Sequence, residues 1–321
     1  MTIELSLSSF CYPDKFSTMI STGILFALVA AVIFSISAII NRKAVIGREI
    51  TPGMFISVAI GVPLILPVII LNGDIFTITS LAPYTIFLLA MMGLFQFVGG
   101  RGLNMAAIKL LGATRSSPVR ETSLIHSAVW GVLLLNENLS IFAGLAILVI
   151  SAGAIITSMS GEPPSEKGSR NFGHSILLRG VIYGLLGAAL WGFTPILIRV
   201  ALPGVISPLL AVWVSFLFAT IMWALIITGT RKVGTIRRLG RTGIILFLFG
   251  GVMVVIAQIL RFNALNLEQV VVVVPILFGL DPLLTLLFSF ILIRKLEGIN
   301  RLVILGVAAS TLGAIGVASG I

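Results

Sequence analysis

The sequence predicts an all-α polytopic membrane protein with ten transmembrane helices, arranged as two inverted five-helix repeats. Of its 321 residues, 58% are hydrophobic and only 10% are charged, whereas soluble domains average about 25% charged residues. Its apolar residues gather in runs, and sequence features of the first half recur in the second. This composition excludes an ordinary soluble enzyme, a disordered chain and, because Cys11 is the only cysteine, a disulfide-stapled secreted domain.

Each expected helix is an apolar run bounded by polar residues, glycine or proline. About 20 helical residues cross the ~30 Å hydrocarbon layer of a bilayer, in which a helix satisfies its own backbone groups. The ten expected spans are residues 20–41, 53–72, 83–107, 116–135, 140–158, 177–198, 208–228, 242–264, 270–293 and 302–320. The polar tail before them lacks the basic start of a signal peptide. Met1 and Met19 are both candidate translation starts.

The two halves of the chain repeat each other at an offset of 157 residues. This offset aligns Gly23 with Gly180, Arg42 with Arg199 and Pro118 with Pro275. Because each half has an odd number of spans, two halves of the same fold enter the membrane from opposite sides, as in many secondary transporters. The expected organisation is an N-terminal tail (1–19), a first repeat (20–158), a linker (159–176) and a second repeat (177–321).

The basic residues predict an orientation in the membrane. Sixteen lie in or beside the loops after the first, third, fifth, seventh and ninth spans, whereas the other side has only Lys15 and Arg199. Basic loops stay in the cytoplasm, so we expect a multi-pass cell-membrane protein with both termini outside. The net charge of +10 is then mainly a topology signal, and we expect no nucleic-acid partner.

Several local motifs resemble the EamA family of the drug/metabolite transporter superfamily. They are Leu–Trp–Gly–Phe at 190–193, Pro118 and Pro275 early in their spans, and Leu–Leu–Asn–Glu at 134–137, which becomes Arg–Lys–Leu–Glu at 294–297. The resemblance covers about residues 20–320 and implies a secondary transporter or exporter of small metabolites. Two features depart from it. Phe–Ser at 34–35 stands where the family often has Trp–Gly, and many members have cytoplasmic termini, whereas the loop charges here favour the opposite orientation.

Ionisable groups inside a membrane cost about 2.5–3.5 kcal/mol on insertion scales, so each needs a reason. Arg101 and Asn104 lie three residues apart, and so do their repeat equivalents, Gln258 and Arg261. Each pair shares a helix face. These faces, extended by Gln96, can line a shared aqueous cavity or form hydrogen bonds between helices. The two arginines can alternatively extend to the headgroups.

Each half also has one carboxylate within a span. Asp281 lies near the middle of the ninth span, and Glu121 lies one turn before Leu124, its repeat equivalent. A buried carboxyl group can exchange its proton for the charge of a substrate, which suits proton-coupled transport. The alternatives are an ion pair of Glu121 with Arg101 or Arg120 and a hydrogen bond from Asp281 to a neighbouring helix. We favour a functional role for Asp281 because no arginine lies near it in sequence.

Two further residues complete the candidate site. Trp191 lies deep in its span and can form an aromatic cavity wall, and His126 can relay protons or simply pack between helices. The sequence contains no Walker A phosphate-binding loop, and two histidines with one cysteine are too few for a usual zinc or haem site. We therefore expect no cofactor, no metal and no enzymatic activity.

Together these features predict a secondary active transporter, with export as the expected direction. Its substrates would be small polar or amphiphilic metabolites such as amino acids, moved by alternating access and coupled to protons. A broad-specificity multidrug exporter is the first alternative. A lipid-handling membrane protein or a polytopic membrane enzyme is the alternative of another class. The expected partners are the small-molecule substrate, protons and the lipid bilayer, and a homodimer stays open.

Overall fold

The computed structural model describes residues 14–135, 141–159, 173–201, 207–267, 280–297 and 299–319. All regular secondary structure within these residues is helical. Residues 160–172 of the expected linker, and also Glu137 and Pro275, lie outside them.

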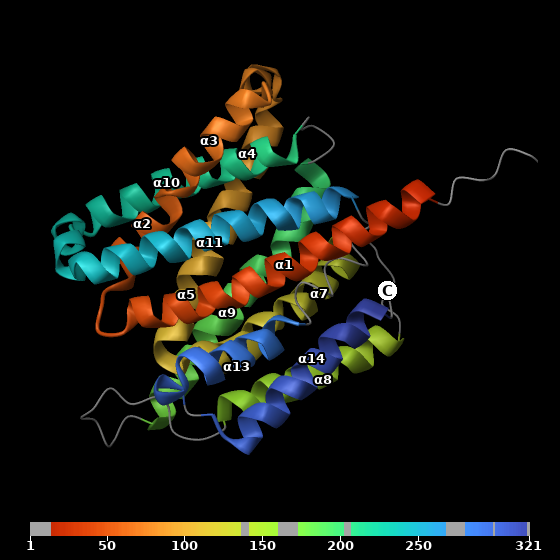
Figure 1. The fold of residues 1–321 in the computed structure, drawn as a ribbon, viewed down its shortest axis with the longest axis vertical. Coiled ribbons are helices and arrows are strands. Elements are labelled where there is room, and N and C mark those ends of the chain that lie inside the picture. Colours follow the sequence, from red (N-terminus) through yellow and green to blue (C-terminus); the bar gives the residue numbers. More distant parts are fainter. Residues whose placement is uncertain are drawn as a thin grey trace, which may run out of the picture.

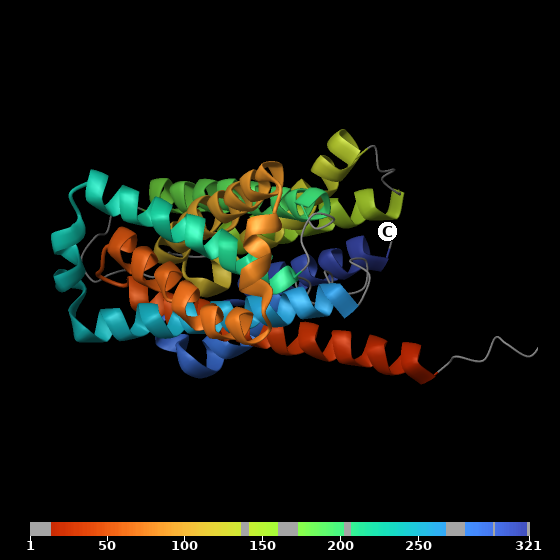
Figure 2. The same ribbon diagram turned by 90° about the horizontal axis from the view of Figure 1, so that it is seen from above.

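The first half contains eight α-helices with one 3₁₀ and one π segment. They are α1 (Asp14–Val45), α2 (Ile50–Ala59), α3 (Gly61–Leu71), η1 (Asp74–Ser80), α4 (Pro83–Gly93), the π segment η2 (Leu94–Gly100), α5 (Arg101–Leu111), α6 (Ala113–Glu121), α7 (Ser123–Leu135) and α8 (Ile141–Met159). The second half contains α9 (Gly173–Ala201), α10 (Pro208–Gly229), η4 (Val233–Leu239), α11 (Gly240–Leu267), α13 (Asp281–Leu292), η5 (Arg294–Leu296) and α14 (Arg301–Ser319). Figure 2 shows η4 joining α10 to α11 at one end of the bundle.

Six described helical segments are long and apolar enough to cross a membrane. They are Thr22–Val45, Ile50–Leu71, Pro83–Leu111, Ser175–Thr194, Pro208–Gly229 and Val233–Ala264. Three shorter apolar helices lie within α8, α13 and α14. The expected fourth span is divided between α6 and α7, and the expected ninth span begins outside the described residues. The polytopic helical fold is thus confirmed, whereas the count of ten spans is not.

Three spans expected to be continuous helices are interrupted. The second breaks at Ile60, the third changes to a π segment between α4 and α5, and the fourth breaks at Thr122. Pro118 lies inside α6 and has no N–H for the helical bond to the fourth residue before it. Thr122 then directs both its amide and its hydroxyl to the carbonyl of Val119, at 3.3 and 2.6 Å. The break leaves Glu121 as the last residue of α6.

Helices of the two halves pack against each other throughout the bundle. α1 packs along α11, α5 along α9, α2 and α4 against α10, and α6 against α13. α1 and α11 lie side by side, and so do α8 and α14 (Figure 1). The core includes fully buried Phe97 and Phe216, with ring centroids 4.0 Å apart. Gly316 of α14 faces Ala146 of α8.

Candidate functional site

A cavity with about 950 Å³ of empty space, its opening included, lies between helices of both halves. The first half contributes side chains from α1, η2, α5, α6 and α7, and the second from α9, α11 and α13. Eight of the nine predicted site residues line it: Gln96, Arg101, Asn104, Glu121, Trp191, Gln258, Arg261 and Asp281. The charged lining consists of these arginines and carboxylates together with Arg120.

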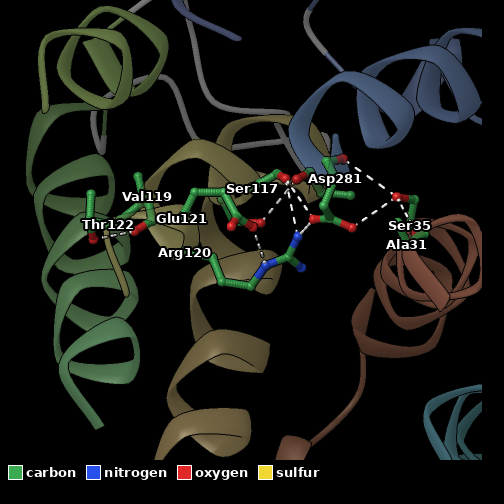
Figure 3. Close-up of polar contacts among 10 residues, drawn as sticks. Ala31, Ser35, Ser117, Val119, Arg120, Glu121, Thr122 and Asp281 are labelled. Atoms are coloured by element: carbon green, nitrogen blue, oxygen red, sulfur yellow. Dashed lines mark hydrogen bonds and ion pairs between the residues drawn. The ribbon is translucent and has the colours of Figure 1, made fainter. Parts of the chain in front are cut away.

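One guanidinium group bridges the two cavity carboxylates. Arg120 forms an ion pair with Asp281 Oδ2, and its Nε donates to Glu121 Oε1 at 3.2 Å. Figure 3 shows the guanidinium of Arg120 between the two acidic side chains. Since Glu121 ends α6 and Asp281 begins α13, this cluster joins the two halves beside the cavity.

The two carboxylates differ in how completely their oxygens are satisfied. Ser35 Oγ donates to Asp281 Oδ1 at 2.8 Å, and Ser117 Oγ donates to Oδ2 at 3.2 Å, in addition to the bond from Arg120. Glu121 is fully buried, and its Oε2 has no hydrogen-bond partner among the described residues. Its carboxylate also interacts electrostatically with Arg261. Glu121 therefore has fewer hydrogen-bond partners among the described residues than Asp281.

Both other cavity arginines are buried. Arg101 is 5% exposed and donates to Ser57 Oγ at 2.8 Å and to the Ser57 carbonyl at 3.4 Å. It forms no ion pair within the part of the chain that the structure describes. Arg261 is 6% exposed. The pairs that sequence places on equivalent helix faces, Arg101 with Asn104 and Gln258 with Arg261, thus meet in one cavity.

Trp191 and His126 have different surroundings. Trp191 lines the cavity, and its Nε1 donates to the carbonyl of Gln96 in the π segment at 2.8 Å. A side chain at Gly100 would come within 2.5 Å of the indole, so glycine permits this close packing. His126 is absent from the lining. Its Nδ1 bonds to the carbonyl of Thr122 at 2.8 Å, and its Cβ faces Gly192. His126 thus packs against α9, outside the lining of the cavity.

Sequence reasoning missed the partners of Asp281. Its ion pair with Arg120 and its hydrogen bonds with Ser35 and Ser117 join residues more than 160 positions apart. The absence of a nearby arginine in sequence therefore did not mean the absence of an arginine in space. The only local signal was the presence of serines inside otherwise apolar spans.

A second buried ionic cluster lies at the turn between α5 and α6. Arg42 donates to the carbonyls of Ile108 and Lys109, at 3.2 and 2.9 Å, and lies 3.4 Å from Glu297 Oε1. A cation at a helix C-terminus and an anion at an N-terminus both complement the helix dipole. Arg42 therefore caps the end of α5 while it pairs with the second half of the chain.

Glu297 caps the start of α6 from the other half of the chain. Its two carboxylate oxygens accept the amides of Ala113 and Thr114 at 2.9 and 3.2 Å. Burial raises the pKa of Glu297 above its usual value, and these bonds together with Arg42 only partly oppose the rise. Gly112 turns the chain between the helices with φ +90°, and a side chain there would meet Glu297 Oε2 at 2.5 Å.

The helices and the charged cavity between them define a multi-pass α-helical membrane protein of the transporter class. A model of the EamA-like transporter family matches residues 21–159 and again residues 178–319. The chain belongs to this family, as its sequence motifs predicted, and contains two of its repeats.

Two individual proteins are also similar. One is an uncharacterized transporter of Clostridium kluyveri, 31% identical over 148 residues that cover 45% of this chain and 46% of that protein. The chain therefore aligns with about half the length of this relative. The other is a protein of known crystal structure with a TM-score of 0.57 and 14% identity, covering 94% of this chain and 96% of that one. This second likeness shows a shared fold.

Proposed function

We propose that this protein is a secondary active transporter, with export as its direction, that moves small polar or amphiphilic metabolites such as amino acids. The observation that carries the proposal is the cavity with three arginines and two carboxylates from both halves. Such groups are costly inside a membrane, and they mark substrate and ion pathways in transporters. In inverted-repeat transporters the site lies between the repeats, which rock around it to give alternating access.

The charges of the cavity indicate the kind of substrate. With both carboxylates ionised, Arg120 is shared by Glu121 and Asp281, and the lining keeps one excess positive charge. Among the described residues, Arg101 bonds only to neutral groups of Ser57. A substrate with a carboxylate can bind Arg101 in the bidentate manner that guanidinium groups favour. An amino acid would add an ammonium group for the carboxylate side of the cavity.

The first experiment measures transport into proteoliposomes containing the purified protein. The probes are radiolabelled amino acids, short carboxylic acids, amino-acid amides and cationic dyes, each tested with and without a pH gradient. We expect gradient-dependent flux of probes with a carboxylate and little flux of the amides. Flux of dyes alone would favour the multidrug alternative, and absence of all flux would favour the lipid-handling or enzymatic alternatives.

Orientation and assembly are proposed separately. The loop charges favour termini outside the cytoplasm, so a C-terminal reporter that works only outside should be active. Activity of a cytoplasmic reporter would overturn this orientation. A homodimer is also proposed, and a mass measurement of the purified protein in detergent would test it, since a single-chain mass would contradict it.

A further inference from the structure

We propose that Glu121 is the carboxyl group that takes up and releases the coupling proton, while Asp281 stays ionised and holds Arg120 in place. This division of roles rests on the proposed transport function and deepens it. It also changes the expectation from sequence, which favoured a functional role for Asp281 because no arginine lies near it in sequence. The contacts of the two carboxylates carry the inference.

Asp281 has the environment of a permanent anion. Both of its oxygens accept hydrogen bonds, from Ser35 on one side and from Ser117 and Arg120 on the other. It also lies in the first turn of α13, where the helix dipole favours a negative charge. These partners come from α1, α6 and the α13 terminus, so protonation of Asp281 would weaken contacts between both halves of the protein.

Glu121 has the environment of a group that changes its protonation state. Within the described residues, only Oε1 has a hydrogen-bond partner, Arg120, and this same guanidinium is already paired with Asp281. Oε2 is buried without a partner in the described structure, although the residue lines the cavity. A buried carboxylate oxygen without a donor is costly, and a proton bound to it removes that cost. Arg120 meanwhile stays bound to Asp281.

The surrounding charges allow this exchange. In the cavity lining, Glu121 is accompanied by Arg120 of its own helix, Arg101 of α5, Arg261 of α11 and Asp281 of α13. The described parts of α1, α7, α8, α9 and α14 contribute no charged side chain to that lining. Arg101 bonds to neutral groups of Ser57 and can bind the carboxylate of a substrate, so Glu121 can bind the ammonium group of that substrate.

The proposed exchange conserves protons and charge. A proton binds Glu121 Oε2 from one side of the membrane. On the other side, the ammonium group of an amino-acid substrate approaches the carboxylate, the proton leaves to water, and an ion pair takes its place. Substrate and proton then occupy Glu121 in turn, which gives antiport and hence export against an inward proton gradient.

Infrared spectroscopy of the purified full-length protein in lipid nanodiscs tests the assignment without a substrate. The pH is changed, and the C=O band of protonated carboxyl groups is followed in wild type, Glu121→Gln, Glu121→Asp and Asp281→Asn. We expect one titrating component to be lost in Glu121→Gln, shifted in Glu121→Asp and kept in Asp281→Asn. Glu297→Gln is the matched control, which should remove a different component.

The outcomes separate this inference from the proposed function. A Glu121→Gln spectrum identical to wild type at every pH, or no titrating band in wild type, overturns the assignment. If Asp281→Asn does not fold, the spectra of Glu121→Gln and Glu121→Asp still test whether the titrating band belongs to Glu121. If Glu121→Gln does not fold, an unshifted band in Glu121→Asp overturns the assignment. A band assigned to Glu121 together with absence of transport would refute the transport function but leave the protonation site standing.

Discussion

Two buried ionic clusters of this protein both combine arginine with carboxylates, but they differ in how many carboxylate oxygens have hydrogen-bond partners. At the turn between α5 and α6, both oxygens of Glu297 accept backbone amides and one also pairs with Arg42. Beside the cavity, Arg120 serves two carboxylates, and one oxygen of Glu121 has no partner among the described residues.

This difference separates a structural cluster from a functional one. The Glu297 cluster joins two helix ends and lies outside the cavity lining, so its bonds serve the fold. The Arg120 cluster lines the cavity and has unused hydrogen-bonding capacity at Glu121. A buried polar atom without a hydrogen-bond partner lowers stability. Proteins keep such atoms inside a membrane where substrate or ion binding needs them.

The largest expected effect comes from removing the shared cation. Arg120→Gln leaves two buried carboxylates without their guanidinium, and breaking such a pair costs about 3–5 kcal/mol. We expect a much lower thermal stability in detergent and loss of transport. The control is Arg179→Gln, since Arg179 is exposed. Equal stability of the two variants would show that the cavity cluster is not held by Arg120.

Glu297→Ala should be the next most damaging change. It removes the acceptors of two backbone amides and the partner of Arg42, with an expected loss of about 3 kcal/mol. Glu297→Gln keeps one acceptor oxygen and should lose less. Thermal unfolding in detergent measures both variants. A larger loss for Gln than for Ala would contradict the capping role.

Gly112→Ala tests the same turn more gently. Gly112 has φ +90° and ψ 170°, a backbone region almost restricted to glycine that costs a residue with a side chain about 1–3 kcal/mol, and the new Cβ would also meet Glu297. Gly47→Ala is the matched control, since Gly47 has φ +64° and open space around it. We expect Gly112→Ala to lose more stability than Gly47→Ala. When both changes are made in the Glu297→Ala variant, the difference between their losses should become smaller. Equal losses would show that the contact with Glu297 does not matter.

The smallest expected effect is a pH dependence of stability. The pKa of Glu297 is raised in the folded protein, so between its usual and its raised pKa the folded state binds more protons than the unfolded state. This contribution to stability is present at low pH and is lost as the pH rises through the raised pKa. Wild type should therefore show a steeper fall in thermal midpoint with pH than Glu297→Gln. Parallel curves would contradict this prediction.

The sequence predicts the helical membrane fold and the cavity residues well, because both depend on local signals. Long apolar runs indicate spans, and ionisable residues within them indicate a polar interior. The break at Thr122 and the π segment from Leu94 to Gly100 were not predicted, since both interrupt runs of uniform hydropathy. The pairing of Arg120 with Asp281 depends on how α6 packs against α13, which no local pattern encodes.

Glu121 is the proposed link between substrate and protons in the cavity. The most direct test compares two assays in proteoliposomes, using a labelled amino acid that wild type transports. One measures net flux driven by a pH gradient, and the other measures exchange of labelled for unlabelled substrate at equal pH. We predict that Glu121→Gln abolishes the gradient-driven flux, and that its remaining exchange is slower, because the ion pair with the ammonium group is lost, and no longer depends on pH. Gradient-driven flux at the wild-type rate in Glu121→Gln would contradict the claim.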